Sequence, residues 1–240
     1  LVATFDPLLT GESINVKYMN EETDTTWNIN SESPTEGDIT VRKIISNGRY
    51  YHMRIGVDLN AGTGTNQLSL VNHISGVGTT ETVTTSSIDT TGANLIVIGI
   101  SYNKGATPDI QDSKGNTYTA LTAQEVTGNG GSRLYYCSNP TVGTGHTFSN
   151  LGAGSYCTIF VLAFTGDAAP SFDVENGATS ASAGTLATGI VTPTLDKEVV
   201  VTHFMFSASA NASINSGFTI TDSRDFGAAN NYGGAMAYQI

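Results

Sequence analysis

The sequence predicts an all-β protein made of two β-sandwich units, and three observations predict this class. Short runs rich in Val, Ile, Thr and Tyr recur along the 240 residues, and turn-forming residues separate them. No segment repeats apolar residues at the spacing of an amphipathic helix. Only 13% of the residues are charged, while Gly, Ser, Thr and Asn are abundant. This composition favours strands joined by turns over salt-bridged helices.

The first unit is expected over residues 1–75 as a partial β-sandwich of about five strands. In the segment 12–19, Ile14, Val16 and Tyr18 alternate with other residues and therefore lie on one face of a strand. Alternation also predicts strands at 38–45 and 49–59, and "NQLSLVNHI" is expected to close the unit. The small-residue stretch 75–87 is expected to be a linker or a weak leading strand, and the boundary is placed there.

The second unit is expected over residues 76–240 as a jelly-roll-like sandwich. Its strongest strands are predicted where apolar residues run almost without interruption, at 93–102, 155–166 and 198–207. Two stretches share one order: a strong strand, a short strand ending in Asp-Ser and a basic residue, then a strand bearing Tyr. This internal pseudo-repeat is typical of equivalent strands in a Greek-key sandwich.

The two Asp-Ser-basic motifs begin at Asp112 and Asp222 and are predicted to be structural turns. An Asp side chain accepts hydrogen bonds from backbone N–H groups two residues on, and Gly115 supplies a positive φ. We expect Asp112→Ala to cost about 1 kcal/mol of stability without affecting ligand binding. A metal site is disfavoured because one carboxylate beside Lys114 provides too few converging oxygens.

Composition excludes some partners. The net charge of −11 repels phosphate backbones and no basic cluster offsets it, so nucleic-acid binding is not expected. No apolar run reaches membrane-spanning length, so membrane insertion is not expected. The two cysteines, Cys137 and Cys157, lie in strand-like runs, where a disulfide and a pair of buried free thiols both remain open.

Catalytic and cofactor motifs are not found, and we expect a non-enzyme with no cofactor, no metal and no catalytic residue. Nucleophile-elbow, phosphate-loop and His-Glu-x-x-His patterns do not occur. The four histidines lack metal-ligand spacing; they are His52, His73, His146 and His203. Paired carboxylates of glycosidase type were considered at 21–24 and at Asp173 with Glu175. The carboxylates at 21–24 are typical of a solvated turn. Asp173 and Glu175 follow a loop and have no aromatic platform nearby in the sequence, so neither group is expected to be catalytic.

Two groups of motifs carry a resemblance. "GESINVKYMNEETDTTWNIN" and "NGRYYHMRIGVDL" resemble a β-sandwich segment of bacteriophage tail and other virion proteins. "TTGANLIVIGISY", "DSKGNTYTAL" and "RLYYCSNPTVGTGHTFS" are similar to lectin-like or jelly-roll modules of phage and bacterial surface proteins. The resemblance implies a location in a virion or on an extracellular surface. It carries over no functional residue, because the shared positions are turns and core.

We therefore expect a non-enzymatic structural or adhesive segment of a virion, such as a tail, fibre or capsid decoration protein. The alternative is a carbohydrate-binding module of a secreted bacterial surface protein. Expected partners are other virion subunits or further copies of the chain, with a cell-surface glycan as a further candidate. Binding residues favour loops, and we expect ligand contacts at one loop-rich end of the second unit, at Tyr102, Asn103, Asn211 and Asn215. We also expect the chain to be part of a longer polypeptide.

Overall fold

The computed structural model describes residues 2–4, 13–20, 28–29, 40–42, 53–60, 68–103, 106–126, 130–152, 157–166, 170–180, 185–194, 198–207, 212–224 and 232–240. For the strands before residue 61 it describes the backbone alone. These residues form strands and turns, with no helix among them, so the all-β prediction is confirmed.

The chain divides into two compact units, Leu1–Thr65 and Asn66–Ile240. The predicted boundary after residue 75 would cut through β6 (Ser69–Gly78). This strand pairs antiparallel with β14 (Cys157–Thr165), so it belongs to the second unit. The boundary is therefore corrected to lie between Thr65 and Asn66, because the segment "NQLSLVNHI" bonds to a strand much later in the chain.

The described residues of the first unit form five strands in two antiparallel sheets. β1 (Val2–Thr4) pairs with β4 (Thr40–Arg42). β2 (Ser13–Asn20) lies between β3 (Asn28–Ile29) and β5 (Met53–Asn60). The alternating segments thus correspond to β2 and β5, as their period-two pattern predicts.

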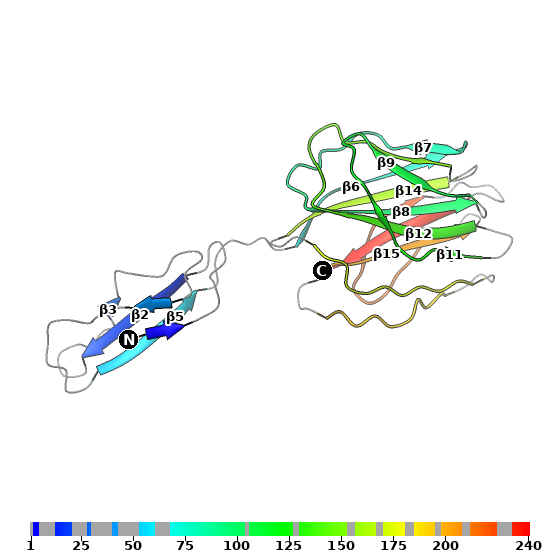
Figure 1. The fold of residues 1–240 in the computed structure, drawn as a ribbon. Coiled ribbons are helices and arrows are strands. Elements are labelled where there is room, and N and C mark those ends of the chain that lie inside the picture. Colours follow the sequence, from blue (N-terminus) through cyan, green and yellow to red (C-terminus); the bar gives the residue numbers. More distant parts are fainter. Residues whose placement is uncertain are drawn as a thin grey trace. The chain divides into compact units, whose positions relative to one another are not determined.

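A six-stranded antiparallel sheet forms the centre of the second unit (Figure 1). Its order is β10 (Thr119–Ala120), β12 (Gly130–Ser138), β8 (Leu95–Asn103), β14 and β6, with β11 (Gln124–Glu125) also beside β12. Every residue of β8 and β14 except the last is buried. The continuous apolar runs of these two strands are explained by this position, because both faces of the strands are covered.

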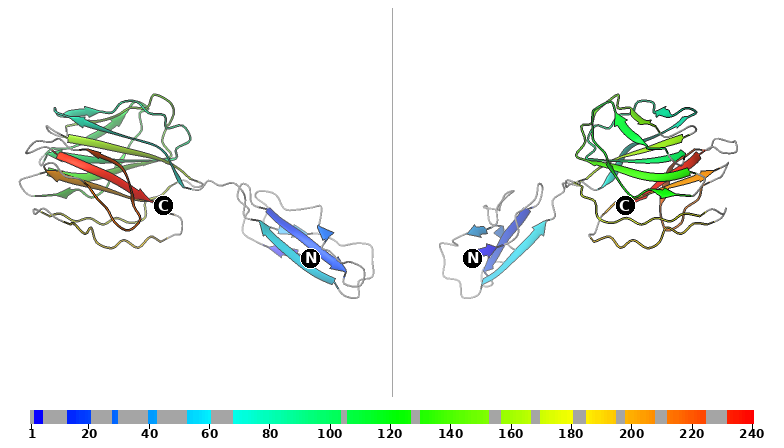
Figure 2. Two further views of the ribbon diagram at one scale, coloured as in Figure 1. Left: turned by 180° about the vertical axis from the view of Figure 1, so that it is seen from behind. Right: turned by 45° about the vertical axis from the view of Figure 1, so that its right-hand side comes forward.

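Smaller sheets cover the two faces of the central sheet (Figures 1 and 2). One has the order β7 (Thr82–Thr84), β13 (Phe148–Leu151), β9 (Asp109–Asp112), and the other β15 (Val200–Ser207), β17 (Tyr232–Gln239), β16 (Thr219–Arg224). Alternation along the central strands divides the core between them. Ile98 packs in one cluster with Phe148, whereas Val97 packs in the other with Phe160 and Met236.

The predicted pseudo-repeat is only partly reproduced in the topology. In its first copy β8 and β12 are antiparallel neighbours, and in its second copy β15 and β17 are too. The strands that end in Asp-Ser differ, because β9 pairs with β13 in one outer sheet whereas β16 pairs with β17 in the other. The Asp-Ser strands are therefore not equivalent.

The two Asp-Ser motifs also have different hydrogen bonds. Lys114 N donates to Asp112 Oδ1 at 2.9 Å, and Gly115 has φ +77°, so the predicted turn at Asp112 is confirmed. Asp222 instead lies within β16, where its carboxylate accepts from Ser75 Oγ at 3.0 Å and lies 2.7 Å from His73 Nδ1. The described bonds of Asp222 thus reach across to β6. The turn predicted after Asp222 falls at residues 225–230, outside the described residues.

Both cysteines are buried free thiols of the central sheet, Cys137 on β12 and Cys157 on β14, and β8 lies between these two strands. The disulfide alternative is therefore not realised. In the part of the chain that the structure describes, no helix has the length and apolar character needed to cross a membrane.

Candidate functional site

Of the four residues predicted to contact a ligand, the structure describes Tyr102, Asn103 and Asn215. The Tyr102 ring is buried, and its hydroxyl donates to Glu125 Oε1 at 2.9 Å. Burial raises the pKa of Tyr102, and the bond to Glu125 adds to that rise. Asn103 is half-buried and Asn215 is exposed, whereas Asn211 lies outside the described residues.

Asn103 and Asn215 lie at opposite ends of β17. Asn103 lies two residues after Ser101. The Ser101 hydroxyl donates to the carbonyl oxygen of Gly233, which places this end of β8 near the start of β17. The glycine turn after Asn215 lies beside the side chain of Gln239, at the other end of that strand. The six residue steps from Gly233 to Gln239 correspond to roughly 20 Å along the strand. One small ligand cannot span that distance, so the structure separates these two predicted contacts.

A buried Thr-His-Asp group contains the residue types of a catalytic triad. His146 Nδ1 lies 2.8 Å from Thr90 Oγ1, and His146 Nε2 lies 3.1 Å from Asp112 Oδ2, although this second contact is poorly aligned for a hydrogen bond. Burial lowers the pKa of His146 and outweighs the opposing effect of the Asp112 carboxylate. All three side chains are inaccessible to solvent, so this group serves packing and not substrate binding.

A second histidine lies between the central sheet and the β15 sheet. His203 Nδ1 lies 2.7 Å from Ser132 Oγ. This distance is typical of a catalytic serine–histidine dyad. Burial lowers the pKa of His203 to about 3, so the ring is a very weak base. The ring fits only because residue 99 is glycine, since a Cβ there would lie 2.7 Å from the imidazole. His203 is thus a hydrogen-bonded histidine of strand β15, whereas His52 lies outside the described residues.

A third group joins the edges of two sheets. His73 and Ser75 of β6 both contact the Asp222 carboxylate of β16, and Arg224 Nε donates to Ser75 Oγ at 2.7 Å. The histidine does not lie between the serine and the carboxylate, as a catalytic triad requires. These polar contacts therefore link β6, at the edge of the central sheet, to β16, at the edge of the sheet that contains β15 and β17.

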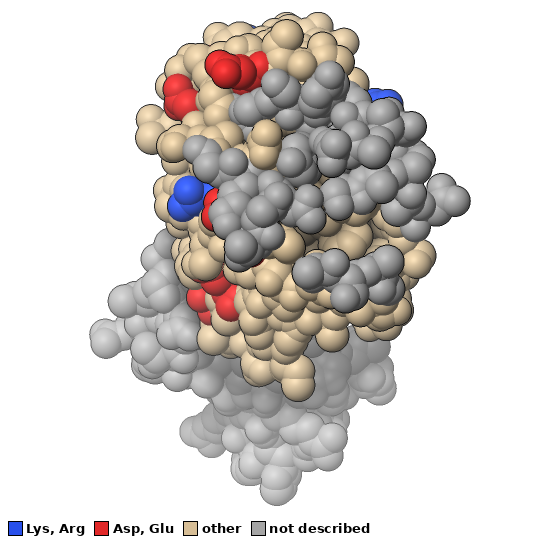
Figure 3. All heavy atoms as spheres, turned by 90° about the vertical axis from the view of Figure 1, so that its right-hand side faces the viewer, with Lys and Arg blue, Asp and Glu red and all other residues tan. Residues whose placement is uncertain are grey.

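The described surface is sparsely charged. On the face drawn in Figure 3, uncharged residues cover most of the described area, with a few acidic and basic side chains among them. Binding at such a surface depends on local hydrogen bonds and apolar contacts more than on a strong field.

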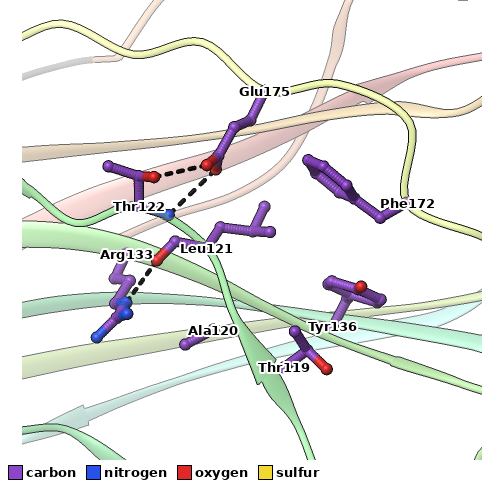
Figure 4. Close-up of a pocket in the computed structure, with 8 residues that line it drawn as sticks. All are labelled: Thr119, Ala120, Leu121, Thr122, Arg133, Tyr136, Phe172 and Glu175. Carbon is purple, nitrogen blue, oxygen red and sulfur yellow. Dashed lines mark hydrogen bonds between the residues drawn. The ribbon is translucent and has the colours of Figure 1, made fainter.

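An open groove of about 360 Å³ lies at the β10 edge of the central sheet (Figure 4). Its apolar wall consists of Tyr136 of β12 and Phe172, whose rings stack with centroids 6.0 Å apart and planes inclined by 20°. Glu175 stands beside them and accepts bonds from Thr122 N at 3.1 Å and Thr122 Oγ1 at 2.6 Å. The remaining lining residues are Thr119, Ala120, Leu121 and Arg133.

Phe172 and Glu175 belong to a non-strand stretch, which we call the outer segment and define as the described residues 170–180 and 185–194 (gold in Figure 1). Its two runs are joined by side chains. Thr194 donates from N and Oγ1 to the Asp173 carboxylate, each at 2.9 Å, and Asn176 Nδ2 donates to the Ile190 carbonyl at 3.1 Å. The paired-carboxylate alternative is weakened here, because Asp173 and Glu175 each bind a different threonine.

The outer segment exposes large apolar side chains. The exposed fractions are 45% for Phe172, 44% for Val174 and 88% for Ile190. Within the described part of this segment no backbone-to-backbone hydrogen bond is formed. The groove and the outer segment therefore form the surface best suited to contact another molecule. Sequence reasoning missed it because Tyr136 and Phe172 lie far apart in the chain.

Comparisons with protein-family models, curated proteins and solved structures found no match to this chain.

Proposed function

We propose that this chain is a non-enzymatic adhesive protein of a virion or another extracellular surface, such as a phage tail, fibre or decoration segment. In this proposal the second unit is a jelly-roll-like sandwich that presents the outer segment to cell-envelope carbohydrate. One observation supports this proposal most strongly. The outer segment is exposed beside an open groove, and it is attached to a sheet whose central strands are buried.

The physical basis is rigidity combined with an adaptable surface. Binding residues commonly lie on loops that a stable scaffold positions. The outer segment is anchored by Glu175 to Thr122 and by Ser138, whose hydroxyl donates to the Pro170 carbonyl. Such anchoring holds the apolar side chains in place and lowers the conformational entropy lost on binding.

The runner-up is a carbohydrate-binding module of a secreted bacterial surface protein. The stacked pair Tyr136 and Phe172 favours it, because an aromatic wall with polar neighbours suits a sugar. Both alternatives use the same contact surface, and they differ in the assembly that carries the chain.

Retention of the full chain on a panel of immobilised bacterial envelope polysaccharides tests this proposal. We expect retention that Val174→Ser weakens, because the substitution removes apolar contact from the outer segment. The matched control is Val77→Ser, since Val77 is 49% exposed and lies on β6 at the opposite edge of the central sheet. If Val77→Ser reduced retention as much as Val174→Ser, the assignment of binding to the outer segment would be contradicted.

The same panel tests the absence of catalysis. We expect no release of reducing ends from any retained polysaccharide during prolonged incubation. Turnover of a polysaccharide would overturn the non-enzymatic part of the proposal, and a failure to retain any polysaccharide would overturn the adhesive part.

A further inference from the structure

The aromatic wall and the size of the groove at the β10 edge indicate a ligand class. Phe172 has its ring stacked on Tyr136 and is nevertheless 45% exposed. This ring therefore offers an apolar surface to a flat or ring-shaped group. The volume of about 360 Å³ is at the lower end of the range for ligand pockets, which suits a mono- or disaccharide.

Hydrogen-bonding groups stand beside this aromatic wall. Both Glu175 oxygens receive a bond from Thr122, but each carboxylate oxygen has a second lone pair. The carboxylate can therefore accept from ligand hydroxyl groups while Thr122 fixes its position, and such charge-assisted bonds are strong. Thr119 and Thr122 are exposed and supply further hydroxyl groups at the groove.

One acidic residue, Glu175, and one basic residue, Arg133, line the groove. Arg133 keeps its positive charge, but its Nε donates to the Leu121 carbonyl at 2.6 Å, and its guanidinium lies 5.5 Å from the centroid of the Tyr135 ring. Figure 4 shows Arg133 across the Ala120–Leu121 backbone from Phe172. A ligand stacked on Phe172 therefore meets a carboxylate in a protein of net charge −11, which disfavours an anionic ligand.

We propose that this groove is a subsite for a neutral pyranose, which stacks its C–H face on Phe172 and donates hydroxyl groups to Glu175. The inference rests on the proposed adhesive function and narrows its ligand class. It assigns Phe172 to ring stacking and Glu175 to the selection of uncharged sugars over uronic acids.

The test is titration of the full chain with neutral hexose and N-acetylhexosamine trisaccharides and with the uronic-acid counterparts of the hexoses. Phe172→Ala should weaken binding of the neutral sugar about tenfold or more, because the apolar contact is lost. Phe172→Tyr should keep the binding, because the aromatic face remains. The matched control is Phe204→Ala, since Phe204 is 39% exposed on β15, outside the groove.

Glu175→Gln tests the charge selection separately. The uronic-acid ligand should bind the wild-type chain several-fold more weakly than its neutral counterpart, and Glu175→Gln should reduce that ratio. Equal or tighter binding of the uronic acid by the wild-type chain would overturn the neutral assignment.

Two further outcomes separate this inference from the proposed function. If polysaccharides retain the chain but Phe172→Ala leaves trisaccharide binding unchanged, or no trisaccharide binds, the subsite is overturned and the adhesive function stands. If neither polysaccharides nor trisaccharides bind, both are overturned.

Discussion

Replacing Phe160 by alanine should lower the free energy of unfolding by about 4 kcal/mol. Phe160 lies in β14 at the centre of the unit and is fully buried in the cluster with Met236. Its ring lies 5.2 Å from the centroid of His203, and a Cβ on Gly234 would lie 3.0 Å from it. Removing the ring loses its burial and leaves a cavity that such close neighbours cannot fill completely.

Denaturant unfolding monitored by circular dichroism measures this effect. The matched control is Phe172→Ala, since the same substitution at an exposed ring should cost less than about 1 kcal/mol. Equal losses for Phe160→Ala and Phe172→Ala would contradict the described core.

Replacing Asp112 by alanine should lower the free energy of unfolding by about 3 kcal/mol, more than the turn alone suggested. The carboxylate is fully buried and accepts bonds from Lys114 N at 2.9 Å, Asn116 Nδ2 at 2.8 Å and Tyr118 OH at 2.6 Å. Alanine would leave these donors and His146 Nε2 without their acceptor. The matched control is Asp109→Ala in the same strand, where the side chain is exposed and the loss should stay within about 0.5 kcal/mol.

The cost of Asp112→Ala should also depend on pH. Burial alone would raise the pKa of Asp112, but the hydrogen bonds from Tyr118 and Asn116, together with the nearby His146 imidazole, outweigh it, and the pKa lies below its ordinary value. A depressed pKa in the folded state stabilises the protein above the unfolded value of about 3.9, and this contribution is lost as pH falls through the folded pKa. The stability difference between wild type and variant should thus be constant near neutral pH and shrink below about pH 4. A difference that does not change down to pH 2 would contradict the assigned role.

Strands that depend on local pattern could be predicted from the sequence. β8 and β14 are nearly continuous apolar runs, and the structure buries both on two faces. The turn at Asp112 follows from local chemistry as well, because its donors lie two and four residues on. In these cases the interactions that decide the structure lie within a few residues of one another.

The remaining features depend on partners that are distant in the sequence. β6 was assigned to the wrong unit because its alternating pattern fits either sheet, and β14 decides its place. Asp222 resembles Asp112 in its sequence neighbours, but it contacts His73 and Ser75, which lie about 150 residues earlier in the chain. The groove was missed for the same reason, since Phe172 has no aromatic neighbour in the sequence and stacks on a ring of β12.

Amide chemical-shift mapping of the full chain during titration with the tightest-binding neutral trisaccharide tests the central claim most directly. We expect saturable shifts confined to the groove, at residues 119–122 and 172–177, and unchanged amides at Asn103 and Asn215. The Phe172→Ala chain should need about tenfold or more ligand to reach the same shifts. Saturable shifts at Asn103 or Asn215, without shifts of the groove amides, would contradict the placement of the sugar in the groove.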